Sequence, residues 1–488
     1  MKTKLFWICF YFVLLLNPGR VMADEVLYAH IGDIVSIKGH LTIKDIAKHQ
    51  CYDWRHRESL DIDINSPKSV RIHPNGKKYY VNSLEGERTV VYDMATNRKL
   101  RVIHHIFTGG NKQLWNKPSG LYPFRGYSGD PLVFNGKPVE SVFVKDGQYL
   151  LVTYYRRSFD LNAQDPSALA VIDTRRDTIV RMIETGPLPK MIAVSPDDRT
   201  VAVTHWGNNT VGLLDISSAD PRQWHYVACV AVGKKLDLHF SRTEKVNRDA
   251  VSGLKLRGTV FLPGNRYLLV SCMSGAGGIA VIDIQKRAFL GMLHGMMPNV
   301  RHMIIKSGCL YLSVNLTGYV QRIPLDSVMH GISRLHNGNV SLHGWTTCKV
   351  FPGTRTICAS PSGRYIFAAC SYGNHLAVID TKTMKMIGSM VVDSYPVGLD
   401  VSPDGRYVIV TSQGRKHHGG NAVNVLRIDY VHSEITAPSA VSKQKSVGHR
   451  RPGSTEPSVA LLPKRWIVAG ALVLLVLLAV IWIYKRFI

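Results

Sequence analysis

The sequence is short of acidic residues. It holds 35 Asp and Glu against 60 Lys and Arg, which gives a formal charge of +25. Most of this excess falls on residues 24–440 rather than on the two ends of the chain. A surface of this kind favours anionic partners, of which an acidic glycan or a protein fits best and nucleic acid is less favoured. A generally basic proteome would produce the same excess, so charge alone does not identify a partner.

The cysteine patterns that mark many metal and haem sites are also missing. No two cysteines have Cys-x-x-Cys spacing, which excludes zinc sites of that kind and covalent haem attachment. Of the eight cysteines, Cys9 lies in the apolar N-terminal segment, and the remaining seven are an odd number that rules out full pairing. The sequence has neither a serine-nucleophile elbow nor a phosphate-binding glycine loop. We therefore predict no catalytic residue, metal or cofactor from motifs, and enzyme activity stays open.

Both ends of the chain carry long apolar segments. Residues 1–23 combine two lysines, an apolar stretch and small residues at the end, which predicts a signal peptide. Residues 466–484 contain no charged residue and are long enough to cross a bilayer as one transmembrane helix. We therefore expect an ectodomain at 24–436, a basic flexible linker at 437–465 and a short cytoplasmic tail at 485–488. This arrangement predicts a single-pass cell-membrane protein whose ectodomain faces the periplasm or the exterior.

What the sequence has in quantity is a repeated β-turn between alternating apolar runs. Pro, Asp, Asn and Gly recur in it because they preset or tolerate turn dihedrals. Turns repeated at intervals of tens of residues are typical of a β-propeller. The seven turns are His73-Pro74-Asn75-Gly76, Lys145-Asp146-Gly147, Ser195-Pro196-Asp197-Asp198, Pro263-Gly264-Asn265, Lys306-Ser307-Gly308, Ser360-Pro361-Ser362-Gly363 and Ser402-Pro403-Asp404-Gly405.

A strand rich in β-branched and aromatic residues follows each turn, as in Tyr407-Val408-Ile409-Val410. A third strand comes next and often closes on an aspartate, as in Val171-Ile172-Asp173. The fifth repeat departs from this pattern and reads Val320-Gln321-Arg322-Ile323-Pro324. Three or four strands per unit and seven units predict an all-β fold, a seven-bladed β-propeller.

The phrase Pro396-x3-Asp400-Val401-Ser402-Pro403-Asp404-Gly405-Arg406-Tyr407, followed by a Val-Ile-Asp type of strand, resembles the YVTN-repeat family of WD40-like propellers. The resemblance covers about residues 64–432 and is specific for fold rather than activity. It implies relatives among surface-layer repeat proteins, lactonase-like propellers and the haem-binding propeller of nitrite reductases. Residues 24–60 lie outside the clear repeats, and we expect them to add an edge strand or to help close the ring.

Aligning the seven turns exposes equivalent positions at the entrance to each innermost strand, seven or eight residues before the turn closes. Five of the seven are basic, which predicts a ring of cations at one mouth of the central channel. Guanidinium and ammonium groups beside aromatic faces can hold carboxylate, phosphate or sulfate groups. The predicted ligand-binding residues are Lys68, Glu140, Lys190, Arg257, Arg301 and Arg355, joined by His205 and Trp206 from a loop on the same face; the seventh equivalent position is Val397.

The leading interpretation is an extracytoplasmic binding or interaction module for an anionic ligand, an acidic glycan or a protein partner. The alternative is a lactonase-like hydrolase or a haem-binding propeller, in which Glu140, His205 and His302 would act. Two weaker metal candidates are the pair His417-His418, which has no apparent third ligand, and the methionine-rich segment 292–303, whose methionines more often serve packing.

Overall fold

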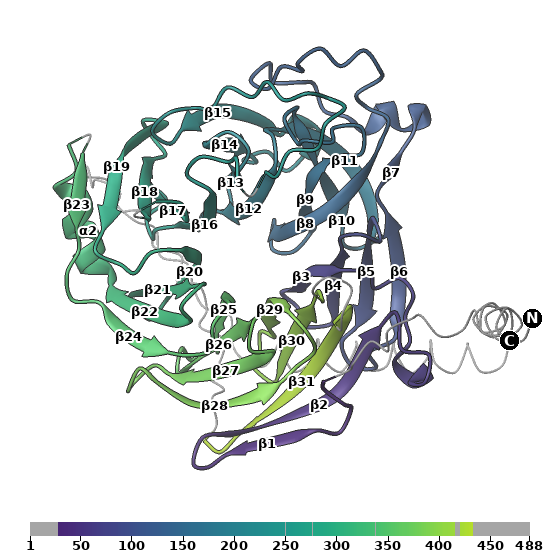
Figure 1. The fold of residues 1–488 in the computed structure, drawn as a ribbon. Coiled ribbons are helices and arrows are strands. Elements are labelled where there is room, and N and C mark those ends of the chain that lie inside the picture. The colour runs from purple at the N-terminus through teal and green to yellow at the C-terminus, as the bar shows by residue number, and fades with distance from the viewer. Residues whose placement is uncertain (1–27, 249, 276, 337, 415–419, 433–488) are drawn as a thin grey trace, which may run out of the picture. The chain divides into compact units, whose positions relative to one another are not determined.

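Seven antiparallel sheets surround a common axis in the computed structural model, which describes residues 28–248, 250–275, 277–336, 338–414 and 420–432 (Figure 1). The predicted all-β, seven-bladed propeller is therefore confirmed. The expected signal peptide, linker, transmembrane helix and tail lie outside the described residues, as do His417 and His418. Within the described ranges, no helix is long and apolar enough to span a membrane.

Each blade has four strands that follow one another from the axis to the outside. They are in chain order in six blades, whereas the fourth strand of the last blade comes from the N-terminal segment. The blades are β3 (Pro67–Ile72), β4 (Lys78–Ser83), β5 (Arg88–Asp93) and β6 (Lys99–His104); β8 (Phe134–Val144), β9 (Tyr149–Arg157), β10 (Ser167–Asp173) and β11 (Thr178–Thr185); β12 (Pro189–Val194), β13 (Thr200–His205), β14 (Thr210–Asp215) and β15 (His225–Ala231); β16 (Leu256–Phe261), β17 (Tyr267–Cys272), β18 (Gly278–Asp283) and β19 (Ala288–His294); β20 (Val300–Lys306), β21 (Cys309–Val314), β22 (Tyr319–Pro324) and β24 (Thr346–Lys349); β25 (Thr354–Ala359), β26 (Tyr365–Cys370), β27 (His375–Asp380) and β28 (Lys385–Val391); and β29 (Pro396–Val401), β30 (Tyr407–Ser412), β31 (Ala422–Tyr430) and β2 (Leu41–Gln50).

A few short elements lie outside this plan. Strand β7 (Ile106–Phe107) pairs with β8, and the short strand β23 (Asn339–Ser341) pairs in parallel with β19. The 3-10 helices are Arg57–Ser59, Gly109–Leu114 and Pro221–Gln223. Helix α2 (Leu325–Ser333) follows Pro324, which explains the irregular fifth repeat because the chain leaves the strand there to form a helix. Val328 and Ile332 bury the apolar face of this helix.

The N-terminal segment completes the last blade. Strand β2 pairs antiparallel with β31 over its whole length, and β1 (Ile34–Ile37) adds a fifth strand at the outer edge. The innermost strand of this blade, β29, lies beside β3 of the first blade, so the ring closes (Figure 1). This is the edge strand expected from residues 24–60. The last blade thus joins the two ends of the propeller sequence.

Local side-chain hydrogen bonds explain why the same residues recur at each turn. Ser402 donates its hydroxyl to the Asp404 carboxylate at 2.6 Å and accepts the Tyr407 amide at 2.9 Å. Gly405 adopts a left-handed φ of 76°, a conformation that glycine allows at little cost. The aspartates that close the third strands serve the next turn, since Asp173 accepts the amide of Arg175 at 2.9 Å.

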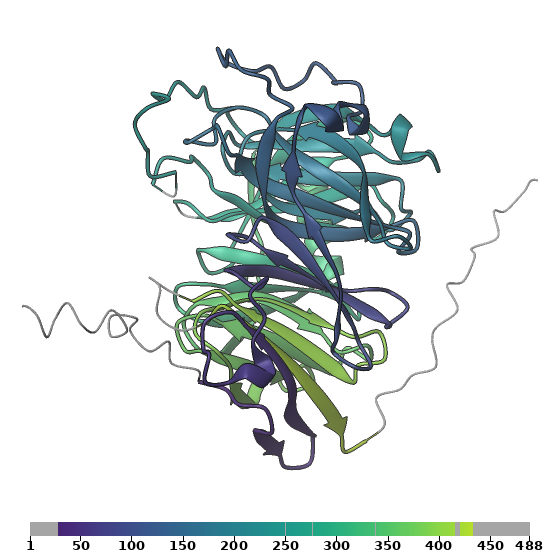
Figure 2. The same cartoon turned by 90° about the vertical axis from the view of Figure 1, so that its right-hand side faces the viewer.

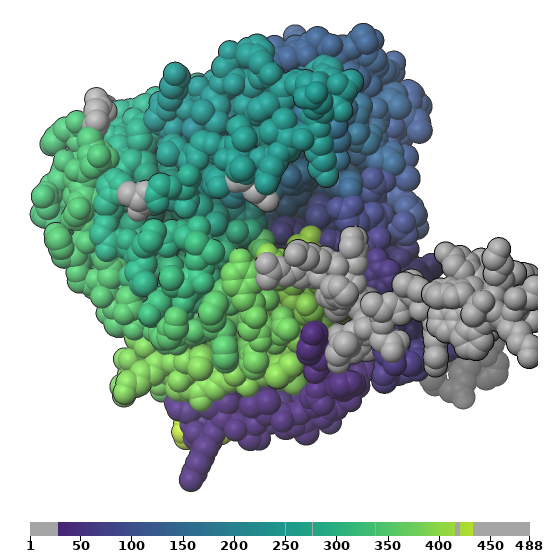
Figure 3. Space-filling view, viewed as in Figure 1, coloured from purple at the N-terminus to yellow at the C-terminus, as the bar shows by residue number. Residues whose placement is uncertain are grey.

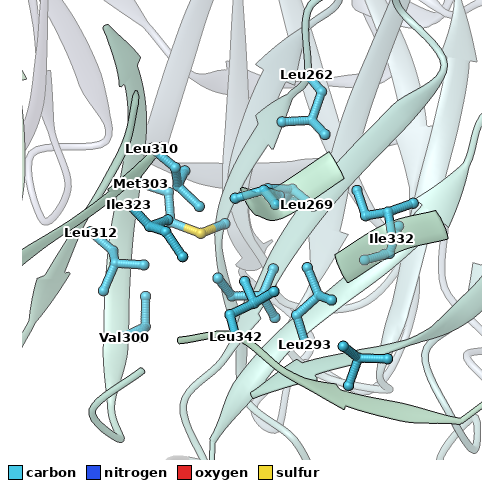
Figure 4. Packing of buried hydrophobic residues seen from close by; sticks show 14 of the residues in the cluster. Leu262, Leu269, Leu293, Val300, Met303, Leu310, Leu312, Ile323, Ile332 and Leu342 are labelled. Carbon is cyan, nitrogen blue, oxygen red and sulfur yellow. The ribbon is translucent and has the colours of Figure 1, made fainter. Parts of the chain in front are cut away.

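Apolar side chains fill the spaces between neighbouring blades. Figure 4 shows one such core between the fourth and fifth blades, which contains Leu293 of β19, Met303 of β20 and Leu312 of β21 together with Ile332 of α2. Cys272 and Cys370 are free thiols that end equivalent strands as small buried side chains. The core therefore comes from the alternating apolar residues of the repeats rather than from disulfides.

Buried polar groups fasten β2 to the ring. The Lys48 ammonium lies 2.6 Å from the Asp393 carboxylate, and both side chains are almost completely buried. Asp45 is also buried and accepts a hydrogen bond from Asn424 of β31 at 2.8 Å. Burial raises the pKa of Asp45 to about 7, and Asn424 and Lys48 only partly oppose this effect. The carboxyl group therefore holds a proton in the folded state that the unfolded chain would release near pH 4.

We expect Asp45→Asn to remove part of the pH dependence of stability. Because the folded pKa lies above the unfolded one, wild-type stability should fall as pH rises from about 4 to about 7 and then level off. The variant should match the wild type near pH 4 and melt at a higher temperature near pH 8. Thermal denaturation at both pH values measures this, and equal melting temperatures near pH 8 would contradict it.

Candidate functional site

The residues aligned by sequence occupy one structural position in all seven blades. Each lies where the innermost strand breaks register with its neighbour, for example between Pro67 and Ser69, between Pro189 and Met191, or between Val300 and His302. A β-bulge of this kind leaves one residue unpaired and re-aims its side chain. The full set at these bulges is Lys68, Glu140, Lys190, Arg257, Arg301, Arg355 and Val397.

The chain enters six of these strands through a left-handed residue. Leu188 and Tyr395 adopt this conformation with φ of 53° and 59°, although side chains of their size rarely do. Such residues cost on the order of 1–3 kcal/mol each and concentrate at functional sites. The six entry residues are Ser66, Leu188, Lys255, Asn299, Gly353 and Tyr395.

Hydroxyl groups on the second strands hold the bulges in place. Ser313 accepts the amide of His302 at 3.0 Å and donates to the carbonyl of Arg355 in the next blade at 2.6 Å. Thr411 does the same across the ring closure, since it accepts the Gly398 amide at 3.1 Å and donates to the Lys68 carbonyl at 3.3 Å. These bonds fix one blade's bulge to the next and so give the ring residues a rigid backbone.

Five of the aligned residues converge near the axis: Lys68, Glu140, Arg257, Arg301 and Arg355, which we call the axial cluster. Arg257 lies 3.2 Å from the Glu140 carboxylate, whereas Lys68, Arg301 and Arg355 make no ion pair with any carboxylate in the described ranges. Arg355 donates instead to the Tyr395 hydroxyl at 3.1 Å. Four cations thus share one carboxylate, which leaves the cluster strongly positive.

Arg301 is the least satisfied member of the axial cluster. Among the residues that the structure describes, its hydrogen-bond partner is the Met273 thioether, 3.9 Å from Nη1. Its Nε is buried and has no partner. A thioether is a weak acceptor, and a buried guanidinium without an acceptor is costly. The folded protein tolerates this arrangement if other interactions offset its free-energy cost, or if a bound anion accepts hydrogen bonds from the guanidinium.

The lowered pKa values of Lys68, Arg301 and Arg355 show that the cluster disfavours their charged forms. Burial, and after it repulsion from the cluster's arginines, lowers the pKa of Lys68 well below its ordinary value. The same two causes lower the pKa of Arg301, while for Arg355 burial lowers the pKa and Tyr395 partly opposes it. A negative charge that entered the cluster would raise the pKa of all three groups.

Lys190 also lies at one of the seven bulges, but its side chain contacts aromatic residues outside the axial cluster. Its ammonium lies 4.2 Å from the ring centroid of Tyr155 and 5.3 Å from that of Trp206. Its backbone carbonyl accepts a hydrogen bond from Arg257 at 2.8 Å. Trp206 is buried and forms the floor under Lys190 rather than an open stacking surface. The structure thus brings together the predicted cations and Trp206.

The structure does not bring His205 to the axial cluster. Its Nε2 lies 2.9 Å from the Thr185 hydroxyl of the second blade, and its Nδ1 lies 2.8 Å from the Thr210 hydroxyl of the third. Burial lowers the pKa of both His205 and His302 to about 3, so both rings are neutral. Within the described residues, no group of three His, Cys, Asp or Glu side chains is placed to hold a metal ion.

Sequence reasoning missed a second basic region beside the axial cluster. A cavity of about 720 Å³ lies on the face turned toward the viewer in Figure 1, which we call the front face. Its cationic and aromatic lining, the front groove, comes from strands β8, β9 and β12 and from the loop between β15 and β16. Figure 2 shows the teal loop between β15 and β16 standing out from this face, and Figure 3 shows the face hollowed near its centre. The front groove consists of Lys137, Tyr155, Arg156, Lys190, Lys245 and Arg248.

Comparison with known proteins supports the fold and leaves the family open. No protein-family model matches the chain. A hydrazine synthase chain from Kuenenia stuttgartiensis superposes with a TM-score of 0.52 at 13% identity and covers 77% of this chain and 99% of its own. The β-propeller domain of Cps50 (Swd1) from Myceliophteria thermophila gives 0.50 at 11% identity, covering 74% and 96%. At such identities the likeness extends to the propeller architecture alone.

One curated protein is similar in sequence. Antigen Lp49 of Leptospira interrogans is 34% identical over 247 residues, which is 46% of this chain and 46% of that protein. The match therefore spans less than half of either chain.

Proposed function

We propose that the axial cluster binds an anionic group of a ligand presented at the front face, and that the protein acts as a binding module. A propeller suits this role because its rigid blades hold side chains from distant parts of the sequence around one axis. The observation that supports the proposal is the Arg301 guanidinium: its buried Nε has no hydrogen-bond partner among the described residues, and the cluster contains one carboxylate, Glu140. A carboxylate, phosphate or sulfate group would supply the missing acceptor.

The double variant Arg301→Gln/Arg355→Gln should weaken retention of the full-length protein on heparin resin. Removing two preorganised charges lowers the number of counterions released on binding, so the variant should elute at clearly lower salt. The matched control is Arg98→Gln/Lys286→Gln, which removes two exposed cations from turns at the opposite ends of the blades. The control should elute close to the wild type. Equal shifts for the two variants, with circular dichroism spectra unchanged, would contradict the proposal.

A further inference from the structure

We infer that the ligand is an acidic oligosaccharide that places one anionic group at the axial cluster and extends its remaining units along the front groove. The inference rests on the proposed function and adds a second, separate contact region to it. The cavity volume of about 720 Å³ lies within the range of about 300–1,000 Å³ that is usual for small-ligand sites. It therefore has room for several linked units.

The front groove keeps most of its positive charge. Five of its lining side chains are cationic, and the acidic residue among the lining, Glu85, pairs with Lys137. Arg156 donates to the carbonyl of Asp160 at 3.0 Å, and Arg248 donates to that of Gly207 at 2.7 Å. Carbonyl oxygens orient these guanidinium groups without neutralising them. The groove thus holds preorganised cations for more than one anionic group.

Lys190 makes the front groove and the axial cluster continuous. Its ammonium lines the groove above the Tyr155 ring, while its backbone carbonyl holds Arg257 of the axial cluster. The same residue therefore contributes to both regions from a single bulge in β12. A ligand bound to Arg257 and Arg301 would pass Lys190 on leaving the axis. Anionic groups repeated along one chain would fit this succession of cations.

The rest of the lining favours a sugar chain over other polyanions. Tyr155 is the aromatic residue of the lining, and the Lys190 ammonium lies over its ring. The apolar residues are small or aliphatic, namely Leu84, Leu161, Ala163 and Val246. Protein partners are usually held by large aromatic anchors in pockets, and single-stranded nucleic acids by several aromatic faces. The groove offers neither, so a hydroxyl-rich anionic chain fits it best.

Titration calorimetry of the full-length protein with galacturonic acid and its linear tetramer tests the inference. The tetramer should bind at least about tenfold more tightly, because its later units bind as part of the same molecule. The groove variant Lys137→Gln/Lys245→Gln should lose most of this advantage and leave monomer affinity unchanged. Arg301→Gln should weaken both ligands by a similar factor.

The outcomes separate the two proposals. Equal affinity for monomer and tetramer, or a groove variant that behaves like the wild type, would overturn the oligosaccharide inference and leave the axial site standing. Tighter binding of hexaglutamate than of the tetramer would also overturn it, in favour of an acidic protein partner. Failure of every one of these anions to bind would overturn the proposed function itself.

Discussion

Replacing Arg301 by methionine is expected to make the ligand-free protein more stable, not less. The wild-type guanidinium lies among like charges, its Nε is buried without a partner, and its pKa is lowered by burial and by Arg355 and Arg257. Replacing buried ionic groups by apolar side chains of similar volume is often neutral or stabilising by about 1–4 kcal/mol. Arg301→Met should therefore raise the melting temperature by a few degrees in buffer that contains no multivalent anion.

The same substitution should remove the response to anions. In the wild type, low millimolar phosphate should raise the melting temperature, because a ligand that binds the folded state stabilises it by mass action. Arg301→Met should show little of this increase. The control is Arg266→Met, whose guanidinium is half exposed and lies 3.3 Å from the buried Asp283, in the turn between β16 and β17. It should be destabilising, because Asp283 loses a partner, and it should keep the phosphate response. An Arg301→Met protein that melts at a lower temperature than the wild type and still responds to phosphate would contradict the inference that Arg301 destabilises the ligand-free protein and binds the anion.

The blades were predictable because their turns are specified locally. Hydrogen bonds link Ser402, Asp404 and Gly405 to one another and to the adjoining strand. Four consecutive residues therefore specify the turn. The stretch between the bulge and the turn has nearly the same length in every blade, and counting back from the turn therefore reaches the same bulge. For this reason the sequence located Lys68, Arg257 and Arg301 at equivalent structural positions.

The direction of a side chain was harder to predict than its position along a strand. His205 and Trp206 are consecutive, yet His205 points into the blade and Trp206 lies under Lys190. Successive residues of a strand face opposite sides. An error of one residue in the predicted alignment therefore assigns a core side chain to the site and a site side chain to the core. A histidine beside a loop resembles a ligand in sequence, whereas in the structure its hydrogen bonds to Thr185 and Thr210 satisfy both ring nitrogens.

The front groove could not be found from the repeats because its walls do not repeat. Arg248 and Lys245 lie in the long connection between β15 and β16, outside the repeated strands and turns. Arg248 reaches back to the Ala163 carbonyl at 2.9 Å, a contact between loops some 85 residues apart. Secondary-structure propensities and turn motifs describe residues that are close in sequence. The contact between Arg248 and Ala163 depends instead on the completed ring. Isolated cations in a loop gave no signal that they would share one cavity.

The closure of the ring is where a single substitution should cost most. Lys48→Ala is expected to lower the free energy of unfolding by about 3–5 kcal/mol, because it leaves a buried charge without its partner. The Asp393 side chain is fully buried, and its carboxylate lies 2.6 Å from the Lys48 ammonium. Lys48 also donates to the Ala29 carbonyl at 2.7 Å, so the substitution loosens the segment before β1 as well. Chemical denaturation of the full-length protein measures the effect.

A matched exposed pair separates burial from charge in this prediction. Arg427 lies 3.1 Å from Asp429, and both side chains are about half exposed, so Arg427→Ala should cost less than about 1 kcal/mol. The double variant Lys48→Met/Asp393→Asn should recover much of the stability that Lys48→Ala loses, since no unpaired charge remains. If Lys48→Ala costs no more than Arg427→Ala, the ion pair does not hold the ring closed, and the pairing of β2 with β31 closes it alone.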